Sequence, residues 1–323
     1  MRVVTADEIE AALSYPALID VVEAAFKVGA IAPPRHHHTV KLAGGEPDAT
    51  LLLMPAWSAS GPGAATAGTY LGIKTVCVFP GNGKRGLPAI QGAYLLLSAE
   101  TGAPLALLDA PRLTAWRTAA ASALAARYLA RADASRMLMV GAGALSAYLV
   151  RAHASVRPIR EVAIWNRTRA GAERVAEVLA GSGLAVTVAD DLEQAVRAAD
   201  IISTATLSAT PLIQGAWLSP GTHLDCVGAY RADMRETDDD VVRRARIWVD
   251  TRAGGFAEAG DILIPLAAGV IGRDKVEGDL FDLARGTAPV RGSDSDITMF
   301  KSVGASIEDL AAAVAVFEGV VSA

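Results

Sequence analysis

The chain has 323 residues and a formal net charge of −5, and 52% of its residues are hydrophobic while 20% are charged. This length favours two domains in a soluble globular protein with an ample core. The charge includes no basic block, which argues against a nucleic-acid partner.

The N-terminal segment is acidic where a signal peptide would be apolar, and no uninterrupted apolar run approaches the length of a membrane span. We therefore expect a cytoplasmic protein with no membrane partner. Cys77 and Cys226 lie inside strand-like runs, which is typical of reduced, packed thiols rather than of a catalytic cysteine.

The first third of the chain predicts a helix followed by strands. Thr5 to Glu8 has the pattern of a capping box, and apolar residues between Leu18 and Phe26 mark one face of a helix that ends near Gly29. β-rich runs separated by Gly, Pro and Asn follow at 38–42, 50–54, 71–79, 91–97 and 105–108. Together these elements predict an antiparallel α+β domain.

From Pro111 onward the pattern changes to a long Ala-rich helix, Thr114 to Ala130, that leads into a short apolar strand at Met137. Strands and helices then alternate at 162–165, 169–180, 185–188, 192–198, 201–204, 222–227 and 247–249. This alternation predicts an α/β domain with a Rossmann-type, doubly wound parallel sheet. A capped helix beginning at Ser306 is expected to return to the first domain.

A glycine-rich turn follows the strand that begins at Met137. Gly141 and Gly143 permit a tight turn, and a helix opens immediately afterwards, so its backbone N–H groups would face a pyrophosphate. Ser146 stands where the dinucleotide fingerprint has Gly or Ala, which is a small departure. The pattern predicts a nicotinamide dinucleotide site.

The end of the next strand carries Asn166, Arg167 and Thr168, where an NAD site would place an acidic residue. A guanidinium and a hydroxyl suit a 2′-phosphate, which a carboxylate would repel. The expected cofactor is therefore NADPH/NADP+, with NADH as a weaker substitute. The alternative is a glycine turn with an ordinary surface arginine.

Seven segments, in order along nearly the whole chain, resemble the ornithine cyclodeaminase/μ-crystallin family. They are Pro33–Arg35, Met54–Pro55, Gly72–Asn82, Thr114–Ala120, Arg136–Ser146, Val227–Glu236 and Asp296–Gly304. The resemblance implies a homodimer in which residues 1–113 plus 305–323 form the substrate-binding and dimerisation domain. Residues 114–304 would form the dinucleotide-binding domain.

The same resemblance implies that Arg35, Lys74 and Arg117 hold the carboxylate of a small α-amino or α-imino acid. Three cations in apolar or small-residue segments would be costly to bury alone, and an incoming carboxylate would compensate them. Each has an ordinary alternative. Lys74 on an alternating strand could face water, and Arg35 could be a plain loop residue. A local helix-stabilising role for Arg117 is disfavoured, because a cation near a helix start gains nothing from the helix dipole. His36, His37 and His38 alternate along an extended chain and so do not predict a metal site.

Further cofactor contacts are implied by the motifs and by strand-end positions. They are Thr118, Gly141, Gly143, Ala144, Leu145, Ser146, Asn166, Arg167, Thr168, Thr204 and Val227.

Tyr230 departs from the cyclodeaminase pattern, which has an acidic residue at this position. A tyrosine phenol does not act as a carboxylate base at neutral pH, so cyclodeamination is disfavoured. The local pattern instead resembles the branch that reduces cyclic ketimines such as Δ1-pyrroline-2-carboxylate and Δ1-piperideine-2-carboxylate, with Tyr230 bounding the pocket or donating a hydrogen bond. Three alternatives stay open: an ornithine or lysine cyclodeaminase, an amino-acid dehydrogenase of the alanine dehydrogenase kind, and an NADP-dependent ligand-binding protein.

Overall fold

The computed structural model describes residues 1–58 and 70–322, which divide into two compact units. Unit 1 comprises Met1–Arg117 and Ala305–Ala323, and unit 2 comprises Thr118–Gly304. The division falls inside helix α3 (Ala110–Leu129). This helix begins earlier than the predicted Thr114, because the Asp109 carboxylate accepts the Arg112 backbone N–H at 2.7 Å and a proline is tolerated in a first turn.

Unit 1 is built on a seven-stranded sheet with the order β1-β7-β6-β5-β4-β2, in which β3 also pairs with β4. Its strands are β1 (Arg2–Val4), β2 (Ala30–Ile31), β3 (His36–Val40), β4 (Ala49–Ser58), β5 (Tyr70–Val78), β6 (Ile90–Ser98) and β7 (Pro104–Asp109), with a 3-10 turn at Pro80–Arg85 between β5 and β6. The pairs are antiparallel as predicted, except that the unpredicted β1 lies parallel to β7.

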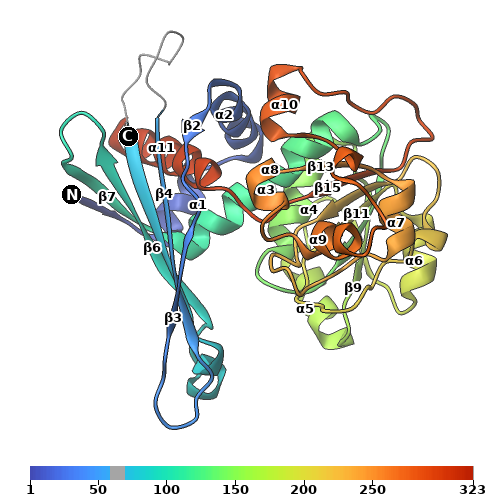
Figure 1. Cartoon of the computed structure of the whole chain (residues 1–323), viewed down its shortest axis with the longest axis horizontal. Helices are drawn as coiled ribbons and strands as arrows, with labels where there is room; N and C mark the ends of the chain where they lie inside the picture. Colours follow the sequence, from blue (N-terminus) through green and yellow to red (C-terminus); the bar gives the residue numbers. More distant parts are fainter. Residues whose placement is uncertain (59–69, 323) are drawn as a thin grey trace. The chain divides into compact units, whose positions relative to one another are not determined.

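Three helices cover one face of this sheet: α1 (Ala6–Ala12), α2 (Tyr15–Val28) and α11 (Ser306–Ser322). The predicted capping box of Thr5 and Glu8 begins α1. Helix α11, drawn in red in Figure 1, contacts α2 and strands β4, β5 and β6. The last helix of the chain therefore packs on strands formed by the first third of the sequence.

Unit 2 is an α/β domain with an eight-stranded, wholly parallel sheet in the order β10-β9-β8-β11-β12-β15-β13-β14. Its strands are β8 (Arg136–Val140), β9 (Glu161–Trp165), β10 (Ala185–Val188), β11 (Ile201–Thr204), β12 (His223–Cys226), β13 (Arg246–Val249), β14 (Val276–Asp279) and β15 (Thr298–Lys301). Sequence order reverses beside β8, which lies between β9 and β11. Dinucleotides bind at the carboxyl ends of strands at such a switch point.

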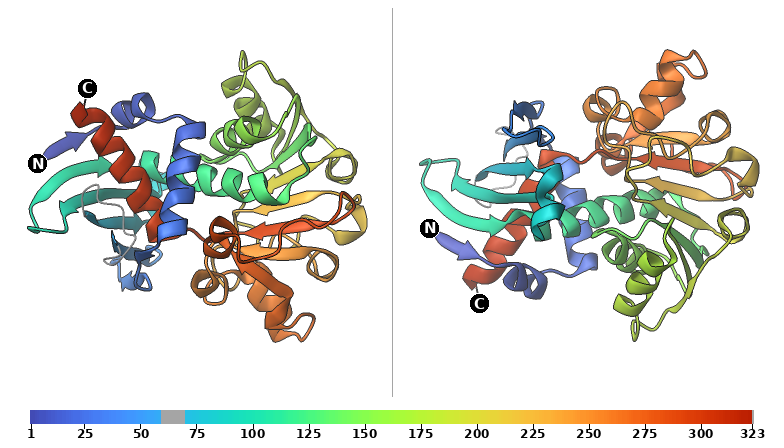
Figure 2. Two further views of the ribbon diagram at one scale, coloured as in Figure 1. Left: turned by 90° about the horizontal axis from the view of Figure 1, so that it is seen from above. Right: turned by 90° about the horizontal axis from the view of Figure 1, so that it is seen from below.

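Helices lie on both faces of this sheet, as Figure 2 shows, so the predicted doubly wound fold is confirmed. They are α4 (Ser146–Val156), α5 (Arg169–Val178), α6 (Leu192–Ala198), α7 (Asp239–Arg244), α8 (Arg252–Gly255), α9 (Gly260–Ala267) and α10 (Leu280–Arg285), with 3-10 turns at Gly215–Trp217 and Arg273–Lys275. Residues 250–304, which contribute two strands and three helices, were not assigned elements from sequence.

The core of unit 2 is made by apolar side chains of its central strands, among them Leu138, Ile202, Leu224 and Met299, packed against α6, α7 and α9. Within residues 1–58 and 70–322, no helix combines the length and the apolar character needed to cross a membrane.

Candidate cofactor and substrate sites

The turn between β8 and α4 has the shape of a phosphate cradle. Gly141 adopts φ 111°, and a Cβ there would lie 2.7 Å from the carbonyl oxygen of Ala205, so only glycine fits. Gly143 faces open space, since a Cβ would meet no described atom within 4 Å. Among the described residues, no side chain caps α4 at Leu145. Open volume next to uncapped N–H groups fits a dinucleotide pyrophosphate.

Ser146, the departure from the fingerprint, is fully buried at the start of α4. Its hydroxyl donates to the Gly141 carbonyl at 3.0 Å and so braces the turn from inside. Ala144 is exposed and Leu145 is half-buried on the outer side of the same turn. The larger side chain is therefore accommodated without closing the cradle.

The polar residues that follow β9 lie at the carboxyl ends of the parallel strands, as the β8–α4 turn does. The Asn166 amide donates to the carbonyl and the hydroxyl of Thr168, both at 2.9 Å, which closes a small turn. Arg167 and Thr168 are exposed. Arg167 makes no ion pair with another residue in the described part of the chain, so its guanidinium is available to a ligand.

Three other predicted cofactor contacts are less accessible. Thr204, the last residue of β11, is fully buried, and its hydroxyl donates to the Glu236 carboxylate at 2.8 Å. The Val227 N–H donates to the Thr204 carbonyl at 2.8 Å, and Thr118 is 7% exposed in α3. The Thr204 hydroxyl therefore supports a neighbouring loop within the chain.

Unit 1 buries a compact cluster of charges between its sheet and α11. The Lys74 ammonium on β5 lies 2.8 Å and 2.7 Å from the two carboxylate oxygens of Asp309. Arg117 on α3 donates from Nε to Asp309 at 2.8 Å and from Nη1 to Glu308 at 2.5 Å. The side chains of these four residues are at most 6% exposed.

These contacts change the electrostatic argument made from sequence. Lys74 and Arg117 are compensated without a ligand, because two acidic residues of α11 already neutralise them. Sequence reasoning missed Glu308 and Asp309 by treating them as part of a helix cap.

The cluster shifts the pKa values of its members. Burial lowers the pKa of Lys74 to about 8, assisted by the nearby charges of Arg117 and Arg35 and opposed by Asp309. Burial alone would lower the pKa of Arg117, but Asp309 and Glu308 outweigh it and raise that pKa. Lys74 can therefore gain or lose a proton near neutral pH, whereas Arg117 keeps its charge.

Tyr94 adds an unused hydroxyl beside this cluster. The side chain is 1% exposed, and its hydroxyl has no hydrogen-bond partner among the described residues. Burial and the charge of Asp309 raise its pKa, so it remains a neutral donor. Gly72 makes room for the ring, since a Cβ there would lie 1.9 Å from the hydroxyl oxygen.

The remaining predicted site residues are Arg35 and Tyr230. Arg35 is half-buried in unit 1, before β3, and its charge is felt at Lys74. Tyr230 belongs to unit 2, where it is half-buried and packs against the core after β12. Lys74, Arg117 and Arg35 therefore share one unit, and Tyr230 belongs with the cofactor turn in the other.

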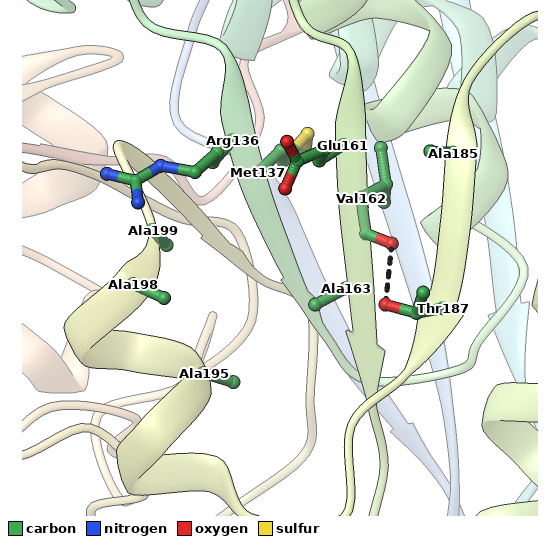
Figure 3. Close-up of a pocket in the computed structure, with 10 residues that line it drawn as sticks. All are labelled: Arg136, Met137, Glu161, Val162, Ala163, Ala185, Thr187, Ala195, Ala198 and Ala199. Carbon is green, nitrogen blue, oxygen red and sulfur yellow. Dashed lines mark hydrogen bonds between the residues drawn. The ribbon is translucent and has the colours of Figure 1, made fainter.

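A separate pocket of about 260 Å³ opens at the amino ends of β8, β9 and β10, where α6 faces them. Figure 3 shows that alanines form much of its lining, with Arg136 and Glu161 at its rim. It lies at the amino ends of the strands, whereas Gly141 and Arg167 lie at their carboxyl ends. A mainly apolar pocket without convergent polar groups does not fit a dinucleotide or an amino acid.

No group of three or more His, Cys, Asp or Glu side chains in residues 1–58 and 70–322 is arranged to hold a metal ion. The rings of His36 and His38 lie on one side of β3 with centroids 6.3 Å apart, and all three consecutive histidines are exposed.

Comparison with known proteins gives these sites a context. The model of the "Ornithine cyclodeaminase/mu-crystallin family" matches residues 1–323. The chain belongs to this family. A Delta(1)-pyrroline-2-carboxylate reductase from Paracoccus denitrificans is 42% identical over 267 residues, which cover 82% of this chain and 82% of that protein.

Two solved structures have nearly the same fold as this chain. Thermococcus litoralis Delta(1)-pyrroline-2-carboxylate reductase in complex with NADH and L-proline has a TM-score of 0.91 and 31% identity, covering 100% of this chain and 98% of that one. An archaeal alanine dehydrogenase dimer with bound NAD has a TM-score of 0.88 and 31% identity, covering 100% and 96%.

Proposed function

We propose that this chain reduces a small cyclic imino acid with NADPH, forming the L-amino acid. Δ1-Pyrroline-2-carboxylate and Δ1-piperideine-2-carboxylate are the substrates that we favour, with proline and pipecolate as products. The observation that carries the proposal is the buried cluster of Lys74 and Arg117 on Asp309, in a chain whose family relatives include enzymes named for this reduction.

The charge balance of unit 1 suits a carboxylate ligand. Asp309 and Glu308 offset the charges of Lys74 and Arg117, and the nearby Arg35 adds a third positive group whose charge acts on Lys74. An arginine can bind a carboxylate through two parallel hydrogen bonds, and Tyr94 supplies a further donor. The cations are pre-ordered by the acids, so little side-chain entropy is lost when a substrate binds.

The reaction needs a hydride and a proton. Bound reduced nicotinamide supplies the hydride. The hydride adds to the carbon of the C=N bond, the π electrons of that bond move to nitrogen, and nitrogen takes a proton. Lys74, with its pKa lowered to about 8, is the residue that we assign to supplying this proton, while Arg117 and Arg35 orient the carboxylate.

NADPH is the proposed cofactor because an exposed guanidinium at the end of β9 suits a 2′-phosphate. Replacing Arg167 by Asp should weaken NADPH binding by about tenfold or more and leave NADH binding within about threefold, since only NADPH loses a phosphate contact and meets a new repulsion. Fluorescence titration with each cofactor measures the two affinities. Equal losses for NADPH and NADH would contradict the assignment.

A panel of cyclic imino acids, and of α-keto acids with and without ammonia, tests the reaction itself by NADPH absorbance. We expect oxidation of NADPH with the cyclic imino acids. Turnover only with pyruvate and ammonia would favour an alanine dehydrogenase activity. Ammonia release from ornithine or lysine without net change in the cofactor would favour a cyclodeaminase, and tight NADPH binding with no reduction would favour a ligand-binding protein.

We also propose that the protein is a homodimer through the face of the unit 1 sheet opposite α1, α2 and α11. Cross-strand neighbours Pro55, Ile73, Leu95 and Leu107 form a half-exposed apolar row on the face opposite Lys74. Leu95→Lys should yield monomers by light scattering, whereas Val178→Lys, at an exposed position of α5, should leave the mass unchanged. A monomeric parent chain would refute the proposal.

A further inference from the structure

Glu236 is a fully buried carboxylate of unit 2 whose hydrogen bonds all reach the end of β11 and the loop that follows it. One oxygen accepts from the Thr204 hydroxyl at 2.8 Å. The other accepts from the backbone N–H of Thr206 at 2.8 Å and from its hydroxyl at 2.7 Å. One side chain therefore holds residues 204–206 in place.

The adjoining strand ends are held by Lys301, the last residue of β15. Its buried ammonium donates to the carbonyls of Cys226 and Gly228 and lies 3.4 Å from a carboxylate oxygen of Asp261. The other oxygen of Asp261 accepts from the backbone N–H of Glu236 at 2.9 Å. Glu236, Lys301 and Asp261 thus form one buried cluster, which joins the carboxyl ends of β11, β12 and β15.

The backbone over this cluster is constrained. Ala229 has φ 50°, the one positive φ at a non-glycine position in the described chain, and this conformation costs free energy. Beside it, a Cβ at Gly228 would lie 2.2 Å from the Thr206 carbonyl oxygen and 2.5 Å from the Glu236 carboxylate. The two loops are therefore packed backbone to backbone, and Tyr230 follows directly.

These loops lie at the carboxyl ends of the parallel strands, where the β8–α4 turn also lies. With adenosine expected at the end of β9 and the pyrophosphate at the start of α4, the nicotinamide half of the cofactor extends toward the ends of β11 and β12. No atom of Glu236 is exposed at the carboxyl ends of these strands. Glu236 therefore affects the cofactor site only by fixing the conformation of the two loops.

We propose that Glu236 is a positioning residue which, together with Lys301 and Asp261, holds residues 204–206 and 227–230 in the conformation that binds the nicotinamide end of the cofactor. This inference rests on the proposed use of a nicotinamide cofactor and adds a residue to that site. The carboxylate is needed because one group must accept three hydrogen bonds from two segments, which an amide or an apolar side chain does not do.

The protonation state of Glu236 determines how many of these hydrogen bonds it accepts. Burial raises its pKa to about 7, with Lys301 opposing the shift and Asp261 reinforcing it. The other titratable group nearby, the Cys226 thiol, has a pKa raised by its own burial and stays neutral. Protonation turns one accepting oxygen into a donor, so one bond to Thr206 or Thr204 is lost as the pH falls through 7.

The test compares Glu236→Gln with Asp200→Asn, a matched change at the other end of β11. Asp200 accepts the backbone N–H groups of Ser135 and Arg136, both at 3.0 Å, at the amino edge of the sheet. NADPH affinity by titration and the melting temperature are measured for both variants. We expect Glu236→Gln to weaken NADPH binding by about tenfold or more, and Asp200→Asn to leave it within about twofold at a comparable loss of melting temperature.

The pH dependence separates positioning from simple stability. NADPH binding to the parent should weaken as the pH falls through about 7, whereas binding to Glu236→Gln should be weak and unchanged over the same range. If Glu236→Gln does not fold, Thr206→Val removes one of the same hydrogen bonds and should weaken binding by a few fold.

Unchanged NADPH affinity in Glu236→Gln, or equal losses in both variants, would overturn this inference and leave the proposed reaction standing. A parent chain that binds NADPH but reduces no imino acid would refute the reaction, while the affinity comparison would still decide the role of Glu236.

Discussion

Replacing Arg117 by Met should lower the free energy of unfolding by about 3–5 kcal/mol, because the buried carboxylates of Asp309 and Glu308 would then lose the guanidinium that pairs with both. Turnover should be lost as well. The change in stability is measured by denaturant unfolding, and turnover by NADPH oxidation with the imino acid that reacts fastest.

A double variant separates these two effects. Arg117→Met combined with Glu308→Gln removes one charge of each sign and leaves the pair of Lys74 and Asp309 intact. Most of the stability should return, while turnover should not, since the substrate carboxylate still lacks its arginine. Parental turnover in the double variant would show that Arg117 does not contact the substrate.

A matched surface change gives the baseline for this experiment. Arg197 pairs with Glu193 one turn away on α6, where both side chains are about half exposed. Arg197→Met should therefore cost only about 0.3–0.5 kcal/mol. A similarly small cost for Arg117→Met would contradict the buried ion pairs of unit 1.

Replacing Asp309 by Asn should move the pH profile of kcat/KM to lower pH. Asp309 raises the pKa of Lys74, which burial has lowered to about 8, so loss of the carboxylate allows that pKa to fall further. If protonated Lys74 is the active form, the rate then declines at a lower pH than in the parent. The profile is measured with saturating cofactor across the neutral and alkaline range.

Glu308→Gln is the matched control, since Glu308 pairs with Arg117. The pH at which kcat/KM of Glu308→Gln declines on the alkaline side should stay close to that of the parent. Lys74→Arg should lose most of its turnover at every pH, because a guanidinium stays protonated and does not supply the proton that the imine nitrogen takes. If kcat/KM of Asp309→Asn declines at the same alkaline pH as that of the parent, Lys74 is not the titrating group.

Local patterns predicted the nucleotide turn well because the information lies within one short segment. The apolar residues of β8, the glycines after it and the helix beginning at Ser146 are all within about a dozen positions. The strands 185–188 and 201–204 and the helix 192–198 agree with the structure at both ends. Each is a short run with a clear boundary residue.

The partners of the buried cations could not be predicted in the same way, because Lys74 and Asp309 are 235 positions apart. A signal was nevertheless present. Asp309 lies four residues before Ala313, so it shares the apolar face of its helix, and a carboxylate on a buried face requires a counter-charge. Treating that acid as part of the helix cap removed the reason to look for a partner.

The cluster of Glu236, Lys301 and Asp261 was missed for a related reason. Lys301 and Glu236 were noticed as motif residues, but no strand was assigned at 298–301, so nothing placed Lys301 beside the ends of β11 and β12. The order of parallel strands, which decides such neighbours, follows from tertiary packing rather than from local pattern.

The dependence of Lys74 and Arg117 on α11 also has a consequence for synthesis of the protein. When the first 117 residues leave the ribosome, both cations lack the acids that neutralise them, and about 190 further residues must be translated before Asp309 emerges. At ordinary elongation rates this delay is roughly 10–40 s. Unit 2 is thus complete first, and the earliest part of the chain reaches its final, electrically balanced state last.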